Sequence, residues 1–459
     1  MFIGRAAELR RLEEAYQAPG TGFVPIYGRR RVGKSELILQ FIQAKPALYF
    51  VGKQAPPQLQ IHDFLQEAAR ALDQPLLASV AASDWRTAME LAVQQKGAAG
   101  KLILVFDEFQ WTAQASPELA SVLQEQLDRG WRQRGDILLV LCGSYIGFME
   151  KEVLGKQSPL FGRRTAQILL RPFSYREASL FHPEWSRGDQ ARAYFLCGGI
   201  PLYLRYFSAR DSIRTNVEHQ LLDEFGPLFR EPDFLLREEL REVQNYYGIL
   251  LALAAGSLPP AAVAQKTGIP ERNLYYYLQQ LTELGYVSRR HPLTGTRPAA
   301  RSVRFALEDP LLRFWFRFVF PHLSFIARMG PERAFAELIH PHLEAYFGAC
   351  FERLCREALP YLYEAEGVRA AFEVGEYWDG QMQIDVVGWR QDGCIDLGEC
   401  RWGAVPSRPE LLATLEQKLS RYPNRAGATL YGRLFTPERL EAPPLAPRVR
   451  CHALEELYG

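Results

Sequence analysis

One segment, Gly28–Ser35 (GRRRVGKS), constrains the fold of this chain more than any other. It matches the pattern GxxxxGK[ST] without departure, follows an apolar run at Val24–Tyr27 and leads into a helical pattern. Its glycines let the backbone bend around an anion, so that N–H groups and the helix N-terminus face a phosphate. The predicted nucleotide-binding residues of the loop are Gly28, Arg29, Arg30, Arg31, Val32, Gly33, Lys34 and Ser35. We expect Lys34 to reach the β- and γ-phosphates of ATP and the Ser35 hydroxyl to bind Mg²⁺.

A second apolar run, Leu102–Phe106, ends in the carboxylates Asp107 and Glu108. Charges at the end of a buried strand are costly unless a cation compensates them. We therefore expect Asp107 to bind Mg²⁺ and Glu108 to polarise an attacking water. A third run, Ile137–Cys142, ends near Ser144, which can orient that water or sense the γ-phosphate, although a serine there is also a common turn residue.

Five apolar runs separated by helical patterns indicate a parallel sheet that is covered on both faces. They are Val24–Tyr27, Ala47–Val51, Leu102–Phe106, Ile137–Cys142 and Gln167–Leu170. The length of 459 residues predicts two to four domains. We expect an α/β ATPase core at 1–170, a helical lid at 171–235, a winged helix at 240–308, an aromatic helical connector at 311–335 and a last α/β domain at 336–459.

Composition restricts the partners and the compartment. The net charge is +1, so any nucleic-acid surface must be a local patch. The seven cysteines show no CxxC spacing, which predicts reduced thiols in the cytoplasm. The most apolar stretch, Leu311–Ala327, is interrupted by Arg313, Arg317 and Pro321, so we expect no membrane span and no membrane partner.

The first 235 residues or so resemble the archaeal-type ATPases, a prokaryotic branch of the AAA+/STAND group of P-loop proteins. The similar segments are Phe2–Arg5 with Glu8-Leu9, the P-loop, Asp107–Trp111, Cys142–Ser144, Phe161–Arg164 and Gly198–Pro201. The resemblance implies an ASCE-type sheet in the order 5-1-4-3-2, a nucleotide pocket bordered by Ile3 and Arg5, Ser144 as a sensor and a lid that begins at Arg171. It also implies that Arg163 or Arg164 contacts the γ-phosphate, in its own chain or in a neighbouring one. The alternative is that these arginines pair with surface acids.

Residues 260–308 predict a winged helix-turn-helix: a short helix, a turn at Gly268–Pro270, a helix at Glu271–Glu283 and two strands. The predicted wing contains several arginines and no acid: Arg289, Arg290, Arg297, Arg301 and Arg304. Such a hairpin can lie along the phosphates of double-stranded DNA. Winged helices also bind proteins, so a protein partner or a homo-oligomer stays open.

The chain beyond Phe314–Phe316 is similar to the domain that accompanies this ATPase branch, whose core resembles the PD-(D/E)XK, or restriction-endonuclease-like, fold. The resemblance implies a second metal site for Mg²⁺ or Mn²⁺ at Glu352, Asp385 and Glu399. Arg401 stands where the family has its lysine, and a guanidinium cannot act as a base. Lys418 on the following helix can replace it, so an active nuclease and an inactive binding platform both stay open.

These observations predict an ATP-hydrolysing switch that couples its nucleotide state to recognition of DNA or of a partner. The alternatives are a metal-dependent nuclease licensed by ATP and a signalling scaffold that binds no nucleic acid.

Overall fold

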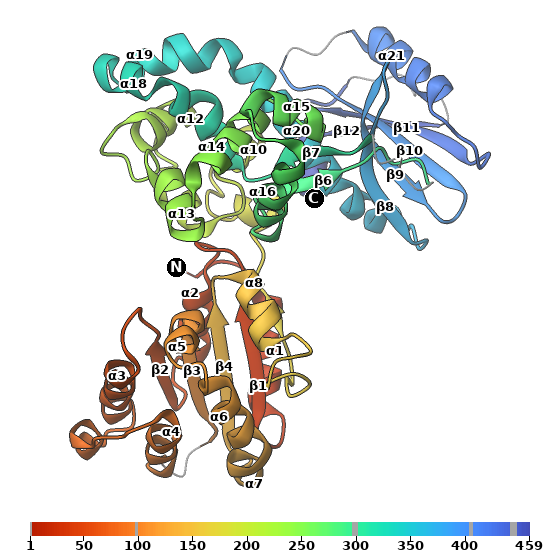
Figure 1. Ribbon diagram of the computed structural model, residues 1–459. Helices are drawn as coiled ribbons and strands as arrows, with labels where there is room; N and C mark the ends of the chain where they lie inside the picture. The colour runs from red at the N-terminus through yellow and green to blue at the C-terminus, as the bar shows by residue number, and fades with distance from the viewer. Residues whose placement is uncertain (1, 97–99, 296–301, 404–406, 441–447) are drawn as a thin grey trace. The chain divides into compact units, whose positions relative to one another are not determined.

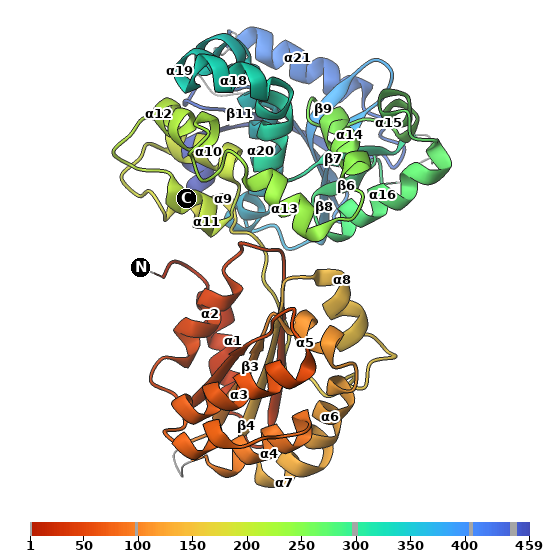
Figure 2. The ribbon, with the colours of Figure 1, turned by 60° about the vertical axis from the view of Figure 1, so that its left-hand side comes forward.

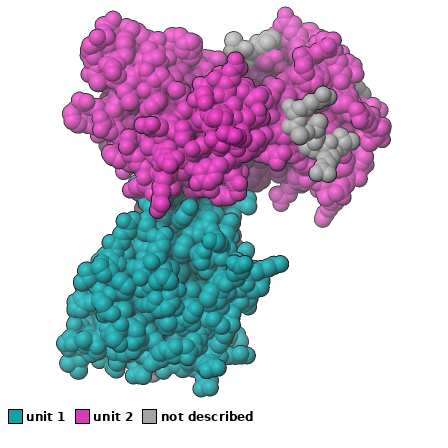
Figure 3. Space-filling view, viewed as in Figure 1, with its two compact units in different colours: residues 1–172 teal, residues 173–459 magenta. Residues whose placement is uncertain are grey.

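The computed structural model describes residues 2–96, 100–295, 302–403, 407–440 and 448–459. The chain divides after Pro172 into two compact units, which Figure 3 colours separately: unit 1 (Met1–Pro172) and unit 2 (Phe173–Gly459). The finer division into five parts stays a prediction. Within the described ranges, no helix has the length and apolar character needed to cross a membrane.

Unit 1 contains a sheet of five parallel strands in the order β2-β3-β4-β1-β5 (Figure 1). The strands are β1 (Gly22–Tyr27), β2 (Ala47–Val51), β3 (Leu102–Asp107), β4 (Ile137–Gly143) and β5 (Ile168–Leu169). This confirms the expected α/β fold and the order 5-1-4-3-2, read from the opposite edge. Every residue of β1, β3 and β4 is buried, which explains their nearly continuous apolar sequences.

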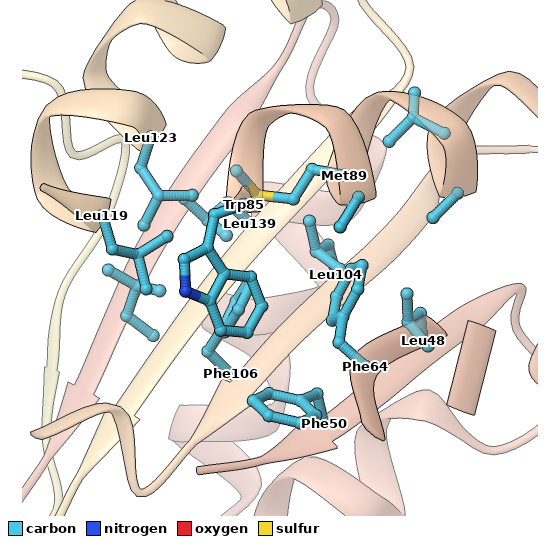
Figure 4. Close-up of a cluster of buried hydrophobic side chains, with 14 of the residues drawn as sticks. Leu48, Phe50, Phe64, Trp85, Met89, Leu104, Phe106, Leu119, Leu123 and Leu139 are labelled. Atoms are coloured by element: carbon cyan, nitrogen blue, oxygen red, sulfur yellow. The ribbon is translucent and has the colours of Figure 1, made fainter. Parts of the chain in front are cut away.

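Helices of unit 1 surround this sheet, as the rotated view shows (Figure 2). They are α1 (Ala6–Gln17), α2 (Lys34–Ile42), α3 (Pro57–Ala71), α4 (Trp85–Gln94), α5 (Phe109–Ala115), α6 (Leu119–Glu125), α7 (Trp131–Arg134) and α8 (Ile146–Phe148). In one core cluster, Trp85 of α4 and Phe64 of α3 pack on Phe106 of β3 (Figure 4). The rings of Phe64 and Phe106 stack at 5.7 Å. This packing fixes the end of β3, where Asp107 lies.

Unit 2 begins with helices α9 (Tyr175–Ser179), α10 (Arg187–Cys197), α11 (Pro201–Tyr206), α12 (Ile213–Val217) and α13 (Glu231–Glu239). A Cβ atom on Gly199 would lie 1.8 Å from the carbonyl oxygen of Phe173, so this close approach requires glycine. The helices pack against the C-terminal part of the chain. The Tyr175 hydroxyl contacts the Leu457 carbonyl, and the Tyr194 hydroxyl donates to Glu357 at 2.8 Å.

The winged helix is present as α14 (Val243–Leu253), α15 (Pro260–Thr267), α16 (Glu271–Glu283) and the antiparallel strands β6 (Val287–Arg290) and β7 (Arg304–Leu307). Leu274, Leu278 and Leu281 of α16 are buried in register, as their spacing predicts. In the aromatic stretch that follows, Phe314, Trp315, Phe316 and Phe318 are buried, but the stretch is not one helix. It comprises α17 (Pro310–Phe314), η6 (Trp315–Val319), η7 (Phe320–His322) and α18 (Leu323–Met329), with the break at Pro321.

The last part of unit 2 contains the long helix α20 (His340–Ala365) and a separate sheet in the order β12-β11-β10-β9-β8. Its strands are β8 (Phe372–Trp378), β9 (Gln383–Arg390), β10 (Cys394–Cys400), β11 (Thr429–Thr436) and β12 (Val449–Ala453), with α21 (Arg408–Arg421) and α22 (Leu454–Tyr458). The sequence predicts an α/β domain here, which this sheet and its helices confirm. The sequence does not predict strand β11, because Gly432 and Arg433 interrupt its apolar pattern. Arg433 is nevertheless buried, since it pairs with Asp396 and Glu366 at 2.7 Å.

Candidate functional site

The P-loop connects β1 to α2 with an unusual backbone. Gly33 has φ 90° and Arg31 has φ 68°, both in the left-handed region. A Cβ atom on Gly28 would lie 2.2 Å from the Leu170 carbonyl oxygen, so only glycine fits where the loop leaves the sheet. The sequence pattern and the strand-loop-helix context therefore agree.

Lys34 is the first residue of α2, and it is 7% exposed. Its ammonium group donates hydrogen bonds to the carbonyl oxygens of Gly28 and Arg29, each at 2.9 Å. Burial lowers the pKa of Lys34, while the charges of Glu108 and Asp107 oppose that shift. The Lys34 ammonium group is thus held inside the P-loop, where it is expected to contact the phosphates.

Asp107 joins the P-loop to the sheet. The Ser35 hydroxyl donates to its Oδ2 at 2.6 Å, and the Tyr49 hydroxyl of β2 contacts the same oxygen. Burial and the charge of Asp107 raise the pKa of Tyr49. The structure therefore brings Ser35 and Asp107 together, as the metal assignment from the sequence requires.

Glu108 lies beside Asp107 in a left-handed conformation, with φ 49°. Its Oε2 accepts a hydrogen bond from the Ser144 hydroxyl at 2.8 Å and contacts the amide of Gln110. The Gln110 amide also donates to the Ser144 hydroxyl at 3.1 Å. Glu108 and Ser144, singled out separately in the sequence, thus share one hydrogen-bonded group with Gln110.

Arg5 fastens the N-terminal segment to the P-loop. Its guanidinium donates to the carbonyl oxygens of Val32 at 3.2 Å and of Arg171 at 2.8 Å. Arg5 is 6% exposed, whereas Ile3 is half-buried. The segment that was expected to border the nucleotide therefore contacts the loop directly through Arg5.

The two candidate γ-phosphate arginines differ in their surroundings. Arg163 forms a bidentate pair with Asp128, at 2.8 and 2.7 Å, and donates to two carbonyl oxygens of its own loop. In this structure, Arg163 therefore pairs with an acid, which was the alternative to its contacting the γ-phosphate. Arg164 is exposed. Burial and the charge of Glu150 raise the pKa of Tyr27, the residue before the P-loop, and the charge of Arg164 partly opposes that rise.

The hairpin of the winged helix is engaged with the C-terminal sheet. Arg290 pairs with Glu308 at 2.7 Å and with Glu376 at 2.8 Å, and Arg304 stacks on Trp378 at 4.8 Å. Of the three described arginines in the predicted wing, only Arg289 is exposed. Arg290 and Arg304 therefore have partners inside unit 2, and Arg289 is the described wing arginine that is exposed to a DNA backbone. Arg297 and Arg301 lie outside the described residues.

The C-terminal carboxylates lie close together and are buried. Asp385 is 6% exposed and Glu399 is 1% exposed. Burial and the charge of Asp385 raise the pKa of Glu352 to about 8. Lys418 of α21 contacts Glu399 Oε2, and Arg401 lies 2.6 Å from Glu399 Oε1 without good hydrogen-bond geometry.

Two cations thus occupy the carboxylate that was expected to bind metal. Among the described residues, no group of three or more His, Cys, Asp or Glu side chains could hold a metal ion. As they are placed, Glu352, Asp385 and Glu399 do not form a ligand set.

Tyr49 and Gln110 are site residues that the sequence did not predict. Gln110 could have been found from its place in the Asp107–Trp111 segment, directly after the acidic pair. Tyr49 is the polar residue in an otherwise apolar strand, and only the pairing of β2 with β3 brings its hydroxyl to Asp107.

Comparisons with known proteins agree with this architecture. Residues 2–207 match the family described as an ATPase domain predominantly from Archaea. Residues 249–291 match the IclR helix-turn-helix domain, and residues 315–411 match a domain described as archaeal and bacterial proteins of unknown function.

Individual relatives were found by sequence and by structure. An uncharacterized protein of Methanocaldococcus jannaschii is 28% identical over 389 residues, which is 84% of each chain. A Walker-type ATPase of Pyrococcus abyssi is similar in fold, with a TM-score of 0.51 and 19% identity, over 69% of this chain and 96% of that one. The ORC2 protein of Aeropyrum pernix matches with a TM-score of 0.44 and 16% identity, over 70% of this chain and 93% of that one. Residues 2–207 therefore carry an ATPase domain similar to the predominantly archaeal family, followed by a segment similar to the IclR helix-turn-helix domain and by one similar to the domain of unknown function.

Proposed function

We propose that ATP is bound and hydrolysed at the connected group Ser35–Asp107–Glu108–Ser144, which links the P-loop to the ends of β3 and β4. Lys34 binds the β- and γ-phosphates, which replace the carbonyl oxygens that it now contacts. The oxygens of Ser35 and Asp107 suit Mg²⁺, a hard cation, which when bound neutralises charge on the phosphates. The 2.6 Å contact between Ser35 and Asp107 is the observation that carries this assignment.

Glu108 is the group that polarises the attacking water. The hydrogen bond from Ser144 and the contact with Gln110 orient its carboxylate, so that the base does not need to reorganise during the reaction. Through the same hydrogen bond, Ser144 can report the presence of the γ-phosphate to Glu108. Arg164, which is exposed, is a better candidate than Arg163 for the γ-phosphate arginine.

Two substitutions test these roles. Lys34→Ala should remove detectable ATP binding, because the triphosphate loses its main cation. Glu108→Gln should keep ATP binding and slow hydrolysis by roughly 10²–10⁴-fold, the usual contribution of a general base. Glu118→Gln, an exposed acid of the same unit, is the matched control. Hydrolysis by Glu108→Gln at the parent rate would show that another group activates the water.

We further propose that the protein is a switch, in which ATP turnover controls recognition by unit 2. The contacts of Tyr175 and Tyr194 support this proposal, because they tie the lid segment, part of the ATPase family match, to the C-terminal helices. A change in the lid is therefore transmitted to the body that contains the winged helix. The exposed residues Arg272, Tyr275 and Tyr276 of α16, together with Arg289, form the candidate surface for duplex DNA.

ATP turnover and DNA binding should be measured together, with and without duplex DNA, at about 50 and 200 mM salt. The switch predicts that DNA stimulates turnover and that binding weakens steeply with salt. Arg272→Glu with Arg289→Glu should weaken DNA binding and leave DNA-free turnover unchanged. Arg425→Glu, at an exposed position elsewhere in unit 2, should change neither DNA binding nor turnover. No response to DNA in any of these assays would favour a signalling scaffold.

A second candidate function is cleavage of nucleic acid by the C-terminal domain. The contact of Lys418 with Glu399 favours it, because a lysine, unlike Arg401, can act as a base. Metal binding would require Glu399 to exchange its present contacts with Lys418 and Arg401 for the metal ion. Mn²⁺-dependent DNA cleavage that is lost in both Lys418→Met and Asp385→Asn would establish the activity. A parent chain that neither cuts DNA nor binds Mn²⁺ by calorimetry would leave the domain as a docking platform.

A further inference from the structure

A cavity of about 220 Å³ lies in unit 2 between the end of α14, the hairpin β6–β7, the α17–η6 segment and α20. Two glutamates, Glu352 and Glu376, lie in its lining against six arginines: Arg290, Arg304, Arg313, Arg317, Arg353 and Arg356. We propose that this cavity binds one or two phosphate groups of an anionic ligand. The site is separate from the P-loop, and the proposal does not depend on the function proposed for unit 1.

Three of the arginines share too few carboxylates. Arg290 pairs with Glu308 and Glu376, Arg353 contacts Glu308, and Arg356 lies 3.5 Å from Glu376. Two acids thus serve three guanidinium groups. Burial, together with the charges of Arg290 and Arg356, lowers the pKa of Arg353. An added anion would relieve this repulsion between like charges.

The other three arginines form no ion pair with a carboxylate among the described residues. They are held by aromatic rings instead: Arg304 by Trp378 at 4.8 Å, and Arg313 and Arg317 by Tyr346 at 5.6 Å each. Stacking fixes the plane of a guanidinium and leaves N–H groups at its edge for a ligand. Arg313 has such a donor, because its Nε is buried without a hydrogen-bond partner while its Nη2 contacts the Cys350 sulfur at 3.3 Å.

Phosphate is the ligand chemistry that fits these donors. Planar, forked guanidinium groups bind phosphate oxygens in pairs, and several arginines around one cavity match a group with several anionic oxygens. Of the two glutamates in the lining, Glu376 is already paired with Arg290 and Arg356. The volume is below the roughly 300–1,000 Å³ of drug-sized pockets, which favours a phosphate or diphosphate group over a whole nucleotide.

The test uses the full chain carrying Lys34→Ala, so that the P-loop does not contribute phosphate binding. Pyrophosphate is titrated by calorimetry in EDTA, without Mg²⁺. We expect one site per chain, weakened at least tenfold by Arg304→Gln with Arg317→Gln. Arg425→Gln is the control, since Arg425 is exposed in unit 2 and lies outside the lining. An unchanged melting temperature without ligand shows that the double variant is folded.

A second titration, with duplex DNA, distinguishes the sources of the phosphate. Pyrophosphate binding that depends on Arg304 and Arg317 supports a free phosphorylated ligand. DNA binding that depends on these arginines, without pyrophosphate binding, supports backbone phosphates as the occupant. The proposal is overturned if neither ligand binds, or if the double variant and Arg425→Gln bind both ligands as tightly as the Lys34→Ala chain.

Discussion

Asp107 shares one carboxylate oxygen between two hydroxyl groups, those of Ser35 and Tyr49. The two donors differ in kind. Ser35 belongs to the P-loop and is a proposed Mg²⁺ ligand, whereas Tyr49 lies on a neighbouring strand. The Tyr49 hydroxyl therefore orients Asp107, a proposed metal ligand, without binding the metal itself. Losing such a hydrogen bond to a ligand commonly weakens metal affinity by roughly 10–100-fold.

Tyr49→Phe tests this role at the residue scale. We expect ATP hydrolysis to persist but to need a Mg²⁺ concentration about tenfold higher for half-maximal rate, because Asp107 loses its orienting donor. The measurement is ATP turnover against Mg²⁺ concentration, with Tyr206→Phe in unit 2 as the control. An unchanged Mg²⁺ requirement would reduce Tyr49 to a packing role.

The site residues differ in whether a short stretch of sequence is enough to predict them. Lys34, Ser35, Asp107 and Glu108 could be predicted because each lies in a short motif at a strand end. Tyr49 could not, since its contact depends on the register that pairs Val51 with Asp107. A single sequence does not fix the register between strands that are distant in the chain.

At the scale of elements, the segment that follows β6 in the hairpin is part of the C-terminal core. Leu293 is 5% exposed and packs in a cluster with Tyr377, Ile384 and Tyr422. Its N–H donates to the Glu376 carbonyl at 2.9 Å, and its carbonyl accepts from the Tyr422 hydroxyl at 2.8 Å. The hairpin thus connects two regions that the sequence presents as separate domains.

Leu293→Ala should therefore destabilise the protein although Leu293 lies in a polar loop. Removing a buried leucine commonly costs about 2–5 kcal/mol, through lost burial and the cavity left behind. Urea denaturation of the full chain measures this loss. Leu251→Ala in α14 is the control, because Leu251 is 42% exposed and its truncation should cost far less. Equal effects of the two substitutions would contradict the docking of the hairpin.

The elements themselves were predictable to different degrees. Helix α16 could be read from the spacing of Leu274, Leu278 and Leu281, and β3 from its apolar run. Strand β11 could not, because Arg433 becomes acceptable in a core only when Asp396 and Glu366 meet it from other elements. The engagement of Arg290 with Glu376 was hidden for the same reason: the partner lies 86 residues away.

At the scale of the whole molecule, stability should depend on a buried histidine. His452 lies 3.1 Å from the Arg433 guanidinium, and burial together with that charge lowers its pKa from 6.5 to about 4. Because the folded pKa is the lower one, the unfolded chain binds more protons between these values. The stabilisation is complete above pH 6.5 and is lost as the pH falls toward 4.

His452→Gln isolates this effect, because the amide still accepts a hydrogen bond from Arg433 but does not titrate. Between pH 7.5 and 5, the parent should lose roughly 2 kcal/mol more unfolding free energy than the variant. Urea denaturation at both pH values gives the comparison. Glu366 does not interfere, because burial raises its pKa but Arg433 and Arg450 lower it to about 2, so its contribution is lost only below pH 4.5. Parallel losses in parent and variant would contradict a neutral, buried His452.

The contacts of Tyr175 and Tyr194 also bear on how such a chain is inherited. The family match of the ATPase domain ends at residue 207, yet its last helices pack against α20 and α22. A gene fusion or deletion made at that boundary would leave the Tyr175 ring without Tyr458, which it meets edge-on at 5.0 Å, and the Glu357 carboxylate buried without its phenol. Recombination should therefore preserve the segment from Phe173 to the C-terminus as one block. Where an ATPase core is joined to a different C-terminal domain, the lid helices should be exchanged along with that domain.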